Sequence, residues 1–178
     1  MANLLTAIRL LLIAPVVMVI ADAERYADWL LLLLVIVAIA SDYFDGKVAR
    51  ALNTASPRGM LFDHGTDFLF VTTALFALST TGLGSLLLPA LIVVAFSQYV
   101  FDSYFLFKDK QLRMSFLGRW NGIFYFAPLV LVAVARLFAS SSQDFLNDLT
   151  VYVSYLLILS TLASIADRAM APLRERDS

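Results

Sequence analysis

The sequence predicts an all-α, polytopic membrane protein with six transmembrane helices, and three observations support this prediction. The 178 residues are 61% hydrophobic and have a mean hydropathy of +0.82, whereas soluble domains are usually about 45–50% apolar. The apolar residues form six segments, each near the ~20 residues that a helix needs to cross a bilayer. Charges and turn-forming residues separate these segments. With no internal repeat or low-complexity segment, residues 1–178 are expected to form one membrane domain.

Charge and cysteine content exclude some kinds of site. The chain has 13 basic and 14 acidic residues without a basic tract, so nothing in it indicates nucleic-acid binding. Cysteine is absent, which excludes disulfides and thiolate metal ligands.

The first apolar segment is interpreted as a membrane helix. The stretch MANLLTAIRLLLIAPVVMVIADA resembles a signal peptide with ADA as its cleavage site. However, only one Arg precedes the apolar run at residues 10–21, and that run lies inside a longer helical pattern. A cleaved signal peptide is therefore the less favoured alternative.

The other segments are bounded by turn formers and charges. Pro57 disfavours helical geometry at Ser56, so the second helix is expected to end before it. The stretches TTGLGS, KDKQLRMS and SSSQDFLND separate the later helices, while RLFASSSQDFLND and RERDS are interpreted as a solvated loop and a solvated tail. The expected helices span about residues 5–21, 29–45, 60–80, 84–107, 117–139 and 146–167.

The basic residues predict the orientation of these helices. If the amino terminus is cytoplasmic, eleven basic residues fall on the cytoplasmic side and only Arg25 and Arg136 on the other, a strong positive-inside bias. The aspartate-rich stretch at residues 41–67 then lies at the cytoplasmic ends of the second and third helices, where a water-soluble substrate can meet a lipid. The eleven are Arg9, Lys47, Arg50, Arg58, Lys108, Lys110, Arg113, Arg119, Arg168, Arg174 and Arg176.

Four aspartates in this stretch have helical spacing. Asp42 and Asp45 are three residues apart and share one helix face, and Asp63 and Asp67 are four apart and share another. The segment between the two helices is short, so we expect antiparallel neighbours whose carboxylates converge. Four separate interfacial aspartates, paired with nearby basic residues, would not explain two matched faces.

Converging carboxylates at membrane depth require a cation. One acidic side chain at the centre of a membrane helix costs roughly 2.5–3.5 kcal/mol, and four cost about 10 kcal/mol before a discount for lying near the interface. The carboxylates also repel one another. Hard oxygen ligands suit Mg²⁺, Mn²⁺ or Ca²⁺, and a divalent pair held by carboxylates typically acts on phosphates.

The whole stretch follows the pattern D-x2-D-G-x2-A-R-x8-G-x3-D-x3-D, with every fixed position filled. This pattern resembles the signature of the CDP-alcohol phosphatidyltransferase family, and the six-helix layout extends the resemblance over nearly the whole chain. The resemblance implies transfer of a phosphatidyl group from CDP-diacylglycerol to a polar alcohol, with release of CMP, in phospholipid synthesis. The fixed positions are Asp42, Asp45, Gly46, Ala49, Arg50, Gly59, Asp63 and Asp67.

The resemblance also implies roles for the aspartates. Asp42, Asp45 and Asp63 would be ligands of Mg²⁺ or Mn²⁺, with two ions expected. Asp67 would be the general base and would also reach the second ion. Physical chemistry agrees with this assignment, because metals on the pyrophosphate would stabilise the charge that develops on the leaving CMP.

Several further residues match positions that hold the CDP part of the donor. Gly46 and Ala49 would let a nucleotide approach the backbone, and Arg50 would pair with a phosphate oxygen. The amino-terminal string NLLTAIR resembles an N-x2-T-x2-R feature of the family near the nucleotide, although a helix N-cap at the Asn is the simpler explanation. The other expected donor-binding residues are Asn3, Thr6, Ser56 and Gly59.

His64 lies in the string LFDHGTD, which resembles choline and ethanolamine phosphotransferases. Members of the family that use glycerophosphate more often have DPxxDK there, so this chain departs from that pattern. His64 would orient a neighbouring carboxylate or accept a proton; a direct catalytic role is the less favoured of these.

The segment KDKQLRMSFLGRWNG carries the candidates for acceptor binding. Arg113 and Arg119 are expected to bind an anionic acceptor such as glycerol 3-phosphate, whereas Lys108 and Lys110 are explained by topology. Asp102 either lines the acceptor pocket or pairs with a neighbouring cation, and the sequence leaves both open.

Glycerol 3-phosphate is the favoured acceptor, with serine, inositol phosphate, a second phosphatidylglycerol or a CDP-aminoalcohol reaction as alternatives. A divalent-cation transporter is the alternative from another class, although it would not need the glycines and arginine of the motif. An inactive scaffold is disfavoured by the intact carboxylate set. The resemblance implies a homodimer in a membrane, here expected to be a bacterial inner membrane with the active site on the cytoplasmic side.

Overall fold

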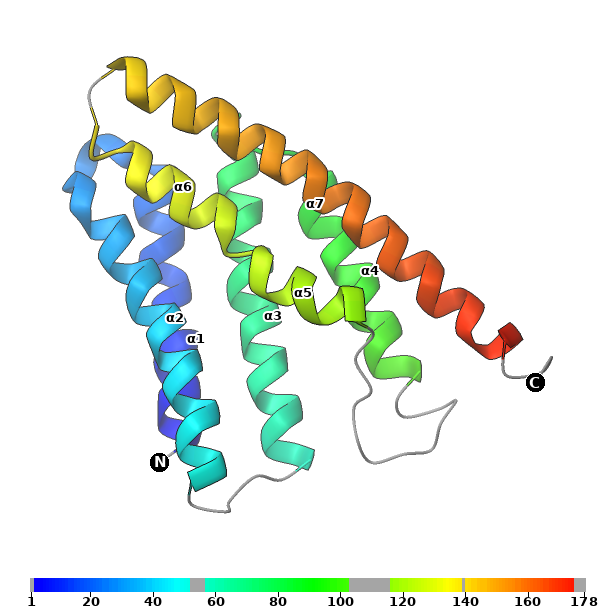
Figure 1. Cartoon of the computed structure of the whole chain (residues 1–178). Helices are drawn as coiled ribbons and strands as arrows, with labels where there is room; N and C mark the ends of the chain where they lie inside the picture. Colours follow the sequence, from blue (N-terminus) through cyan, green and yellow to red (C-terminus); the bar gives the residue numbers. More distant parts are fainter. Residues whose placement is uncertain (1, 52–56, 103–115, 139, 175–178) are drawn as a thin grey trace.

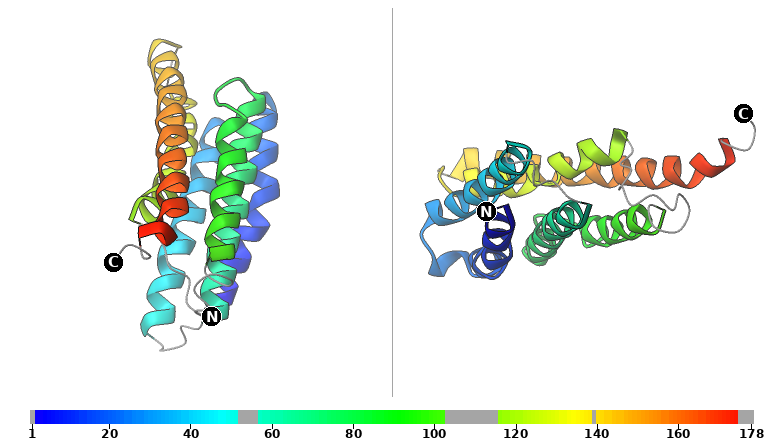
Figure 2. Two further views of the ribbon diagram at one scale, coloured as in Figure 1. Left: turned by 90° about the vertical axis from the view of Figure 1, so that its right-hand side faces the viewer. Right: turned by 90° about the horizontal axis from the view of Figure 1, so that it is seen from below.

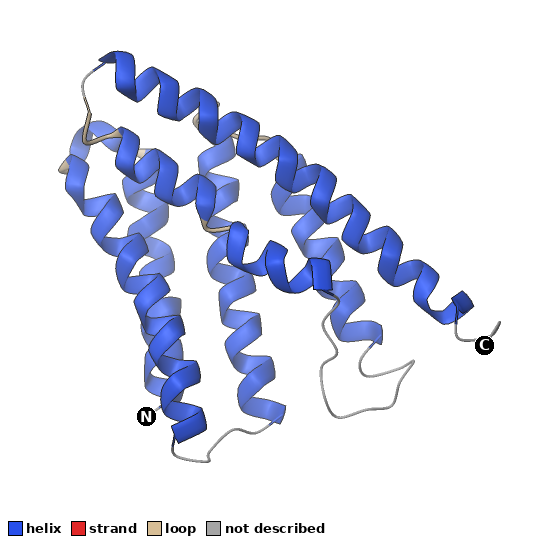
Figure 3. Cartoon of the chain, in the orientation of Figure 1, coloured by secondary structure: helices blue, strands red, loops and turns tan. Residues whose placement is uncertain are grey.

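The computed structural model describes residues 2–51, 57–102, 116–138 and 140–174, and these contain helices and connecting turns without a strand (Figure 3). The predicted all-α class is therefore confirmed for this part of the chain. The elements are α1 (Ala2–Ala21), the 3₁₀ turn η1 (Ala23–Arg25), α2 (Asp28–Ala51), α3 (Pro57–Thr80), α4 (Leu87–Phe101), α5 (Phe116–Phe124), α6 (Ala127–Ala135) and α7 (Ser140–Arg174).

The helices form a closed ring of neighbours (Figure 1). Helix α1 packs against α2 and α3, α3 against α4, α4 against α7, and α7 against α5 and α6, while α6 closes the ring on α2. Seen from below, α1, α3 and α4 form one row and α2, α6, α5 and α7 form the other (Figure 2). Apolar side chains between the rows make the core, including Val16, Leu31, Phe70 and Leu129, all fully buried.

Proline and glycine set several helix ends as expected. Pro57 occupies the first position of α3, where its missing N–H breaks no helical hydrogen bond. In the turn after α3, Gly82 has a φ of +82°, a left-handed conformation that glycine adopts without a steric cost. The chain reverses direction in this turn, so α3 and α4 pack against each other.

The fifth expected helix, residues 117–139, is in fact two helices. Helix α5 ends at Phe124 and α6 begins at Ala127, with Tyr125 and Phe126 in the turn between them. Pro128 explains the break, because it has no N–H to bond the carbonyl of Phe124 and its ring would clash there. The bend aims Tyr125 at the bundle interior, where its hydroxyl lies 2.8 Å from the Thr161 hydroxyl.

The prediction of a solvated loop for RLFASSSQDFLND is wrong over most of its length. Residues 140–148 form the first turns of α7 rather than a connection. The stretch contains no Gly or Pro to stop a helix, and serine is well suited to a helix start. The polar residues of this stretch were therefore wrongly expected to interrupt the helix.

The membrane-spanning character is clearest at the carboxyl-terminal half. Within the described residues, two segments are long and apolar enough to cross a bilayer, Phe116–Ala135 (α5 with α6) and Ser140–Met170 in α7. Thr6–Ala21 and Leu87–Phe101 are apolar but shorter. Large apolar side chains such as Leu11 and Phe116 are 75% and 78% exposed, as expected of surfaces that face lipid.

Candidate active site

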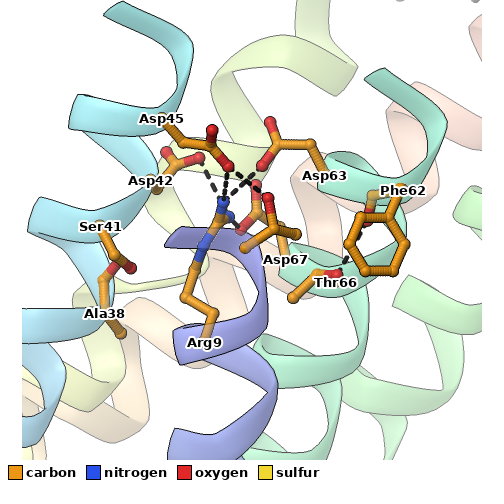
Figure 4. Close-up of polar contacts among 10 residues, drawn as sticks. Arg9, Ala38, Ser41, Asp42, Asp45, Phe62, Asp63, Thr66 and Asp67 are labelled. Carbon is orange, nitrogen blue, oxygen red and sulfur yellow. Dashed lines mark hydrogen bonds and ion pairs between the residues drawn. The ribbon is translucent and has the colours of Figure 1, made fainter. Parts of the chain in front are cut away.

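Four aspartates meet where α1, α2 and α3 come together. Asp42 and Asp45 project from the carboxyl-terminal half of α2, and Asp63 and Asp67 project from the first turns of α3 (Figure 4). Oxygen atoms of Asp42, Asp63 and Asp67 all lie within 4.8 Å of one another. Helical spacing within each helix and the packing of α2 and α3 on the same helix, α1, explain this convergence.

The guanidinium of Arg9 lies at the centre of the four carboxylates (Figure 4). Its Nη1 atom is 3.1 Å from Asp42 Oδ1 and its Nη2 atom is 3.6 Å from Asp45 Oδ2, and it also forms ion pairs with Asp63 and Asp67. The Arg9 side chain is 0% exposed. A buried charge is tolerated when it is paired in this way, so Arg9 is the internal counter-ion of the aspartate cluster.

Sequence reasoning missed this role of Arg9. It treated Arg9 as a topology signal and as part of an N-x2-T-x2-R feature. One signal was present: an arginine in an otherwise apolar helix needs a buried partner, and Thr6 lies on the same helix face. Thr6 is itself buried and donates its hydroxyl hydrogen bond to Asp45.

The cluster has the donor set of a hard divalent cation. All its ligand atoms are carboxylate oxygens, which Mg²⁺ and Mn²⁺ prefer. Four carboxylates and one guanidinium leave a formal charge of −3, which divalent cations would compensate. The chemistry of these residues therefore fits the expected metal, and Asp42, Asp63 and Asp67 are the set whose oxygens lie closest together.

A cavity of about 470 Å³ extends from the cluster toward α4, α5 and α7. Its aspartate end is acidic, its walls are largely apolar and aromatic, and its far side carries two arginines. The combination suits a substrate with both a charged group and a hydrocarbon part. The polar lining residues are Asp42, Asp63, His64, Asp67, Tyr99, Arg119, Tyr125, Ser164 and Arg168.

The two arginines of the cavity come from different helices. Arg119 lies on α5, where Gly118 and Gly122 also line the cavity. Arg168 lies on α7 and was considered from sequence only as a topology signal. It pairs with Asp102 at 3.7 Å, so of the two roles left open for Asp102 the structure favours pairing with a cation. Arg113 lies outside the described residues.

His64 faces the cavity from α3, next to Asp63. Its Nδ1 atom lies 3.1 Å from the hydroxyl of Tyr99 on α4. The histidine thus connects the aspartate end of the cavity to the side where Arg168 lies.

The remaining residues expected to bind the donor occupy the same end of the bundle. Gly46, Ala49 and Arg50 follow Asp45 in the last turns of α2, and Gly59 lies in the first turn of α3. Asn3 lies in the first turn of α1. Ser56 falls outside the described residues.

Comparison with known proteins agrees with this geometry. The sequence model of a family described as CDP-alcohol phosphatidyltransferase matches residues 1–167. A CDP-diacylglycerol–glycerol-3-phosphate 3-phosphatidyltransferase of Cereibacter sphaeroides is 28% identical over 152 residues, 83% of this chain and 66% of that protein. Putative cardiolipin synthases of Mycobacterium bovis and Mycobacterium tuberculosis are 37% identical over 81 residues, 46% of this chain and 38% of theirs. The chain thus spans less than two thirds of these relatives' length. No solved structure matches the chain.

Proposed function

The chain belongs to the CDP-alcohol phosphatidyltransferase family, and on that premise we propose that it transfers the phosphatidyl group of CDP-diacylglycerol to a polar alcohol and releases CMP. One observation carries the proposal. The four motif aspartates converge, and three of them line a cavity of about 470 Å³ that Arg119 and Arg168 also line. Such a cavity offers separate places for a pyrophosphate and for a second, anionic substrate.

The favoured acceptor is glycerol 3-phosphate. Arg119 and Arg168 line the same cavity as the aspartates, and guanidinium groups bind phosphate through paired, charge-assisted hydrogen bonds. The relative from Cereibacter sphaeroides is named for this acceptor, while the mycobacterial relatives are named as putative cardiolipin synthases. Phosphatidylglycerol is therefore the second candidate, since it would also present a phosphate. Serine, inositol phosphate and a CDP-aminoalcohol reaction are further possible outcomes of the test.

Asp42, Asp45, Asp63 and Asp67 would hold the divalent cations, Mg²⁺ or Mn²⁺, which when bound supply positive charge against the phosphate oxygens of the leaving CMP. The protein's own residues would bind the donor and accept the proton. Gly46, Ala49, Arg50 and Gly59, with Asn3, Thr6 and Ser56, would bind the CDP group, and Asp67 would accept the proton of the acceptor hydroxyl. The hydroxyl oxygen then bonds to the lipid phosphorus as the P–O bond to CMP breaks.

We further propose that residues 1–178 form one membrane domain with six spans: α1, α2, α3, α4, the pair α5 and α6, and α7. Exposed apolar side chains and the count of eleven basic residues against two support it. The same count favours a cytoplasmic active site, and the bacterial relatives favour a bacterial inner membrane. A homodimer is the expected assembly, which light scattering of the protein in detergent would test.

The proposed function is tested with purified protein, CDP-diacylglycerol, Mg²⁺ or Mn²⁺, and a panel of alcohols. We expect release of CMP, and mass spectrometry of the lipid product identifies the acceptor. Absence of CMP with every alcohol, together with divalent-cation uptake by proteoliposomes, would favour the transporter alternative instead.

The base assignment predicts different results for two neighbouring residues. Asp67→Asn is expected to lower kcat by about 10²-fold or more, the usual scale for a lost general base, with donor binding largely intact. His64→Ala is expected to have a mild effect, because His64 contacts Tyr99 and lies beside a metal-binding aspartate. Steady-state kinetics and donor binding measure both, with the exposed Asp144→Asn as control. If His64→Ala stops turnover while Asp67→Asn does not, the histidine is the base.

The acceptor assignment predicts a selective change in KM. Arg119→Ala is expected to raise the KM of glycerol 3-phosphate roughly tenfold or more, because a charge-assisted contact contributes about 1.5–3 kcal/mol. The KM of CDP-diacylglycerol should change little. Arg113→Ala tests the second arginine in the same way, and Arg25→Ala is a control at the opposite end of the bundle. Equal changes in both KM values would mean that these arginines do not bind the acceptor and serve only as signals of membrane orientation.

A further inference from the structure

The last turns of α4 connect the aspartate side of the cavity to Arg168. Tyr99 is nearly buried at 6% exposure, and its hydroxyl lies 3.1 Å from Nδ1 of His64 on α3. The guanidinium carbon of Arg168 lies 5.3 Å from the centre of the Tyr99 ring, within the range of a cation–π interaction. Tyr99 therefore contacts His64 and Arg168, two polar residues of the cavity lining, at the same time.

Two further residues, Gln98 of α4 and Asp102 directly after it, hold α7 at the same level. The Asp102 carboxylate pairs with Arg168, and both side chains are largely buried, at 14% and 13% exposure. The side-chain amide of Gln98 donates a hydrogen bond of 3.3 Å to the backbone carbonyl of Ile165. Three contacts thus restrain Arg168: Gln98 holds the α7 backbone nearby, the Tyr99 ring lies against the guanidinium, and Asp102 pairs with its charge.

The Tyr99 ring is itself held in place by aromatic neighbours. Phe96, one turn earlier on α4, has its ring centre 5.9 Å from that of Tyr99 and stacks on Phe68 of α3 at 4.2 Å. Because aromatic packing of this kind limits ring motion, Tyr99 presents a fixed surface to Arg168. A long arginine side chain otherwise has many rotamers, and their restriction opposes binding.

We propose that Tyr99 is a positioning residue for the acceptor: with Asp102, its ring holds the Arg168 guanidinium in the cavity. This inference rests on the proposed function, in which Arg168 binds an anionic acceptor. A guanidinium that is already held in its binding position loses less conformational freedom when it binds a phosphate. Tyr99 itself need not touch the phosphate.

Two variants separate the ring of Tyr99 from its hydroxyl, and a third tests the ion pair of Asp102. Tyr99→Phe keeps the ring under Arg168 and should leave the KM of glycerol 3-phosphate within about twofold of wild type. Tyr99→Met keeps an apolar side chain but removes the ring, and should raise that KM roughly fivefold to tenfold with the KM of CDP-diacylglycerol unchanged. Asp102→Asn should raise the acceptor KM as well, because Arg168 loses its ionic tie. Tyr155→Met, an exposed tyrosine on α7, is the control.

A binding measurement without turnover completes the test. Inorganic phosphate is titrated into detergent-purified protein with Mg²⁺, and the rise in unfolding temperature is followed. Wild type and Tyr99→Phe should be stabilised alike, and Tyr99→Met and Arg168→Gln should need several-fold more phosphate. If wild type transfers no phosphatidyl group, the proposed function fails, yet the titration still decides the role of Tyr99. Equal phosphate responses in Tyr99→Met and wild type, or an acceptor KM that falls in Asp102→Asn, would overturn the proposal.

Discussion

Replacement of Asp63 by Asn is expected to abolish both activity and divalent-cation binding. Asp63 lies within 4.8 Å of the ligand atoms of Asp42 and Asp67, so its loss removes one carboxylate from the centre of the cluster. Loss of a single electrostatic contact to a transition state typically costs about 10² to 10³ in rate, and here a proposed ligand of the metal is lost as well. Asp42→Asn is expected to behave in the same way.

Two measurements check this expectation. CMP release should fall below about one hundredth of wild type, and calorimetric titration with Mn²⁺ should show no detectable binding. Asp144→Asn, an exposed change of the same chemistry on α7, should retain both properties. Full activity of the wild type in excess EDTA, with no residual bound metal, would show that the cluster does not work through a cation.

Arg9→Gln is expected to destabilise the metal-free protein strongly. The change leaves the carboxylates without the guanidinium that pairs with all four. Removing one partner of a buried ion pair typically costs about 3–5 kcal/mol. Asp42 is 43% exposed and Asp63 and Asp67 are 24% and 25% exposed, so water screens part of the repulsion and the lower end of that range is expected.

The dependence on metal makes the test of Arg9 specific. Divalent cations would offset the same negative charge, so the loss of unfolding temperature should be large in EDTA and smaller in Mg²⁺. Arg9→Lys, which keeps the charge without the planar fork, should lie between wild type and Arg9→Gln. Arg25→Gln, in the exposed turn after α1, is the matched control. An identical loss in EDTA and in Mg²⁺ would mean that Arg9 acts through packing rather than charge.

The convergence of the aspartates could be predicted because it depends on local geometry. A helix places residues three and four apart on one face, which aligns Asp42 with Asp45 and Asp63 with Asp67. The expectation that α2 and α3 pack directly against each other is wrong, because both pack on α1, and it is α1 that brings their aspartates together. The same local rules gave the all-α class and the helix ends at Pro57 and at the turn with Gly82.

Local rules also explain the two errors in the helices. The break between α5 and α6 was missed because apolar composition continues through it, although Pro128 prevents the helical hydrogen bond. The start of α7 was missed because serine and aspartate were read as a loop, although neither stops a helix as Gly or Pro does.

What the sequence by itself determined is the set of carboxylates and the helix faces that carry them. Which cation lies among those carboxylates was decided only by tertiary structure. Arg9 is far from the aspartates in sequence, yet it pairs with them, because α1 packs against both α2 and α3. Likewise Arg168 meets Tyr99 and Asp102 only because α7 crosses α4. Spacing along one helix follows from its geometry, whereas contacts between distant helices follow from how their buried faces pack.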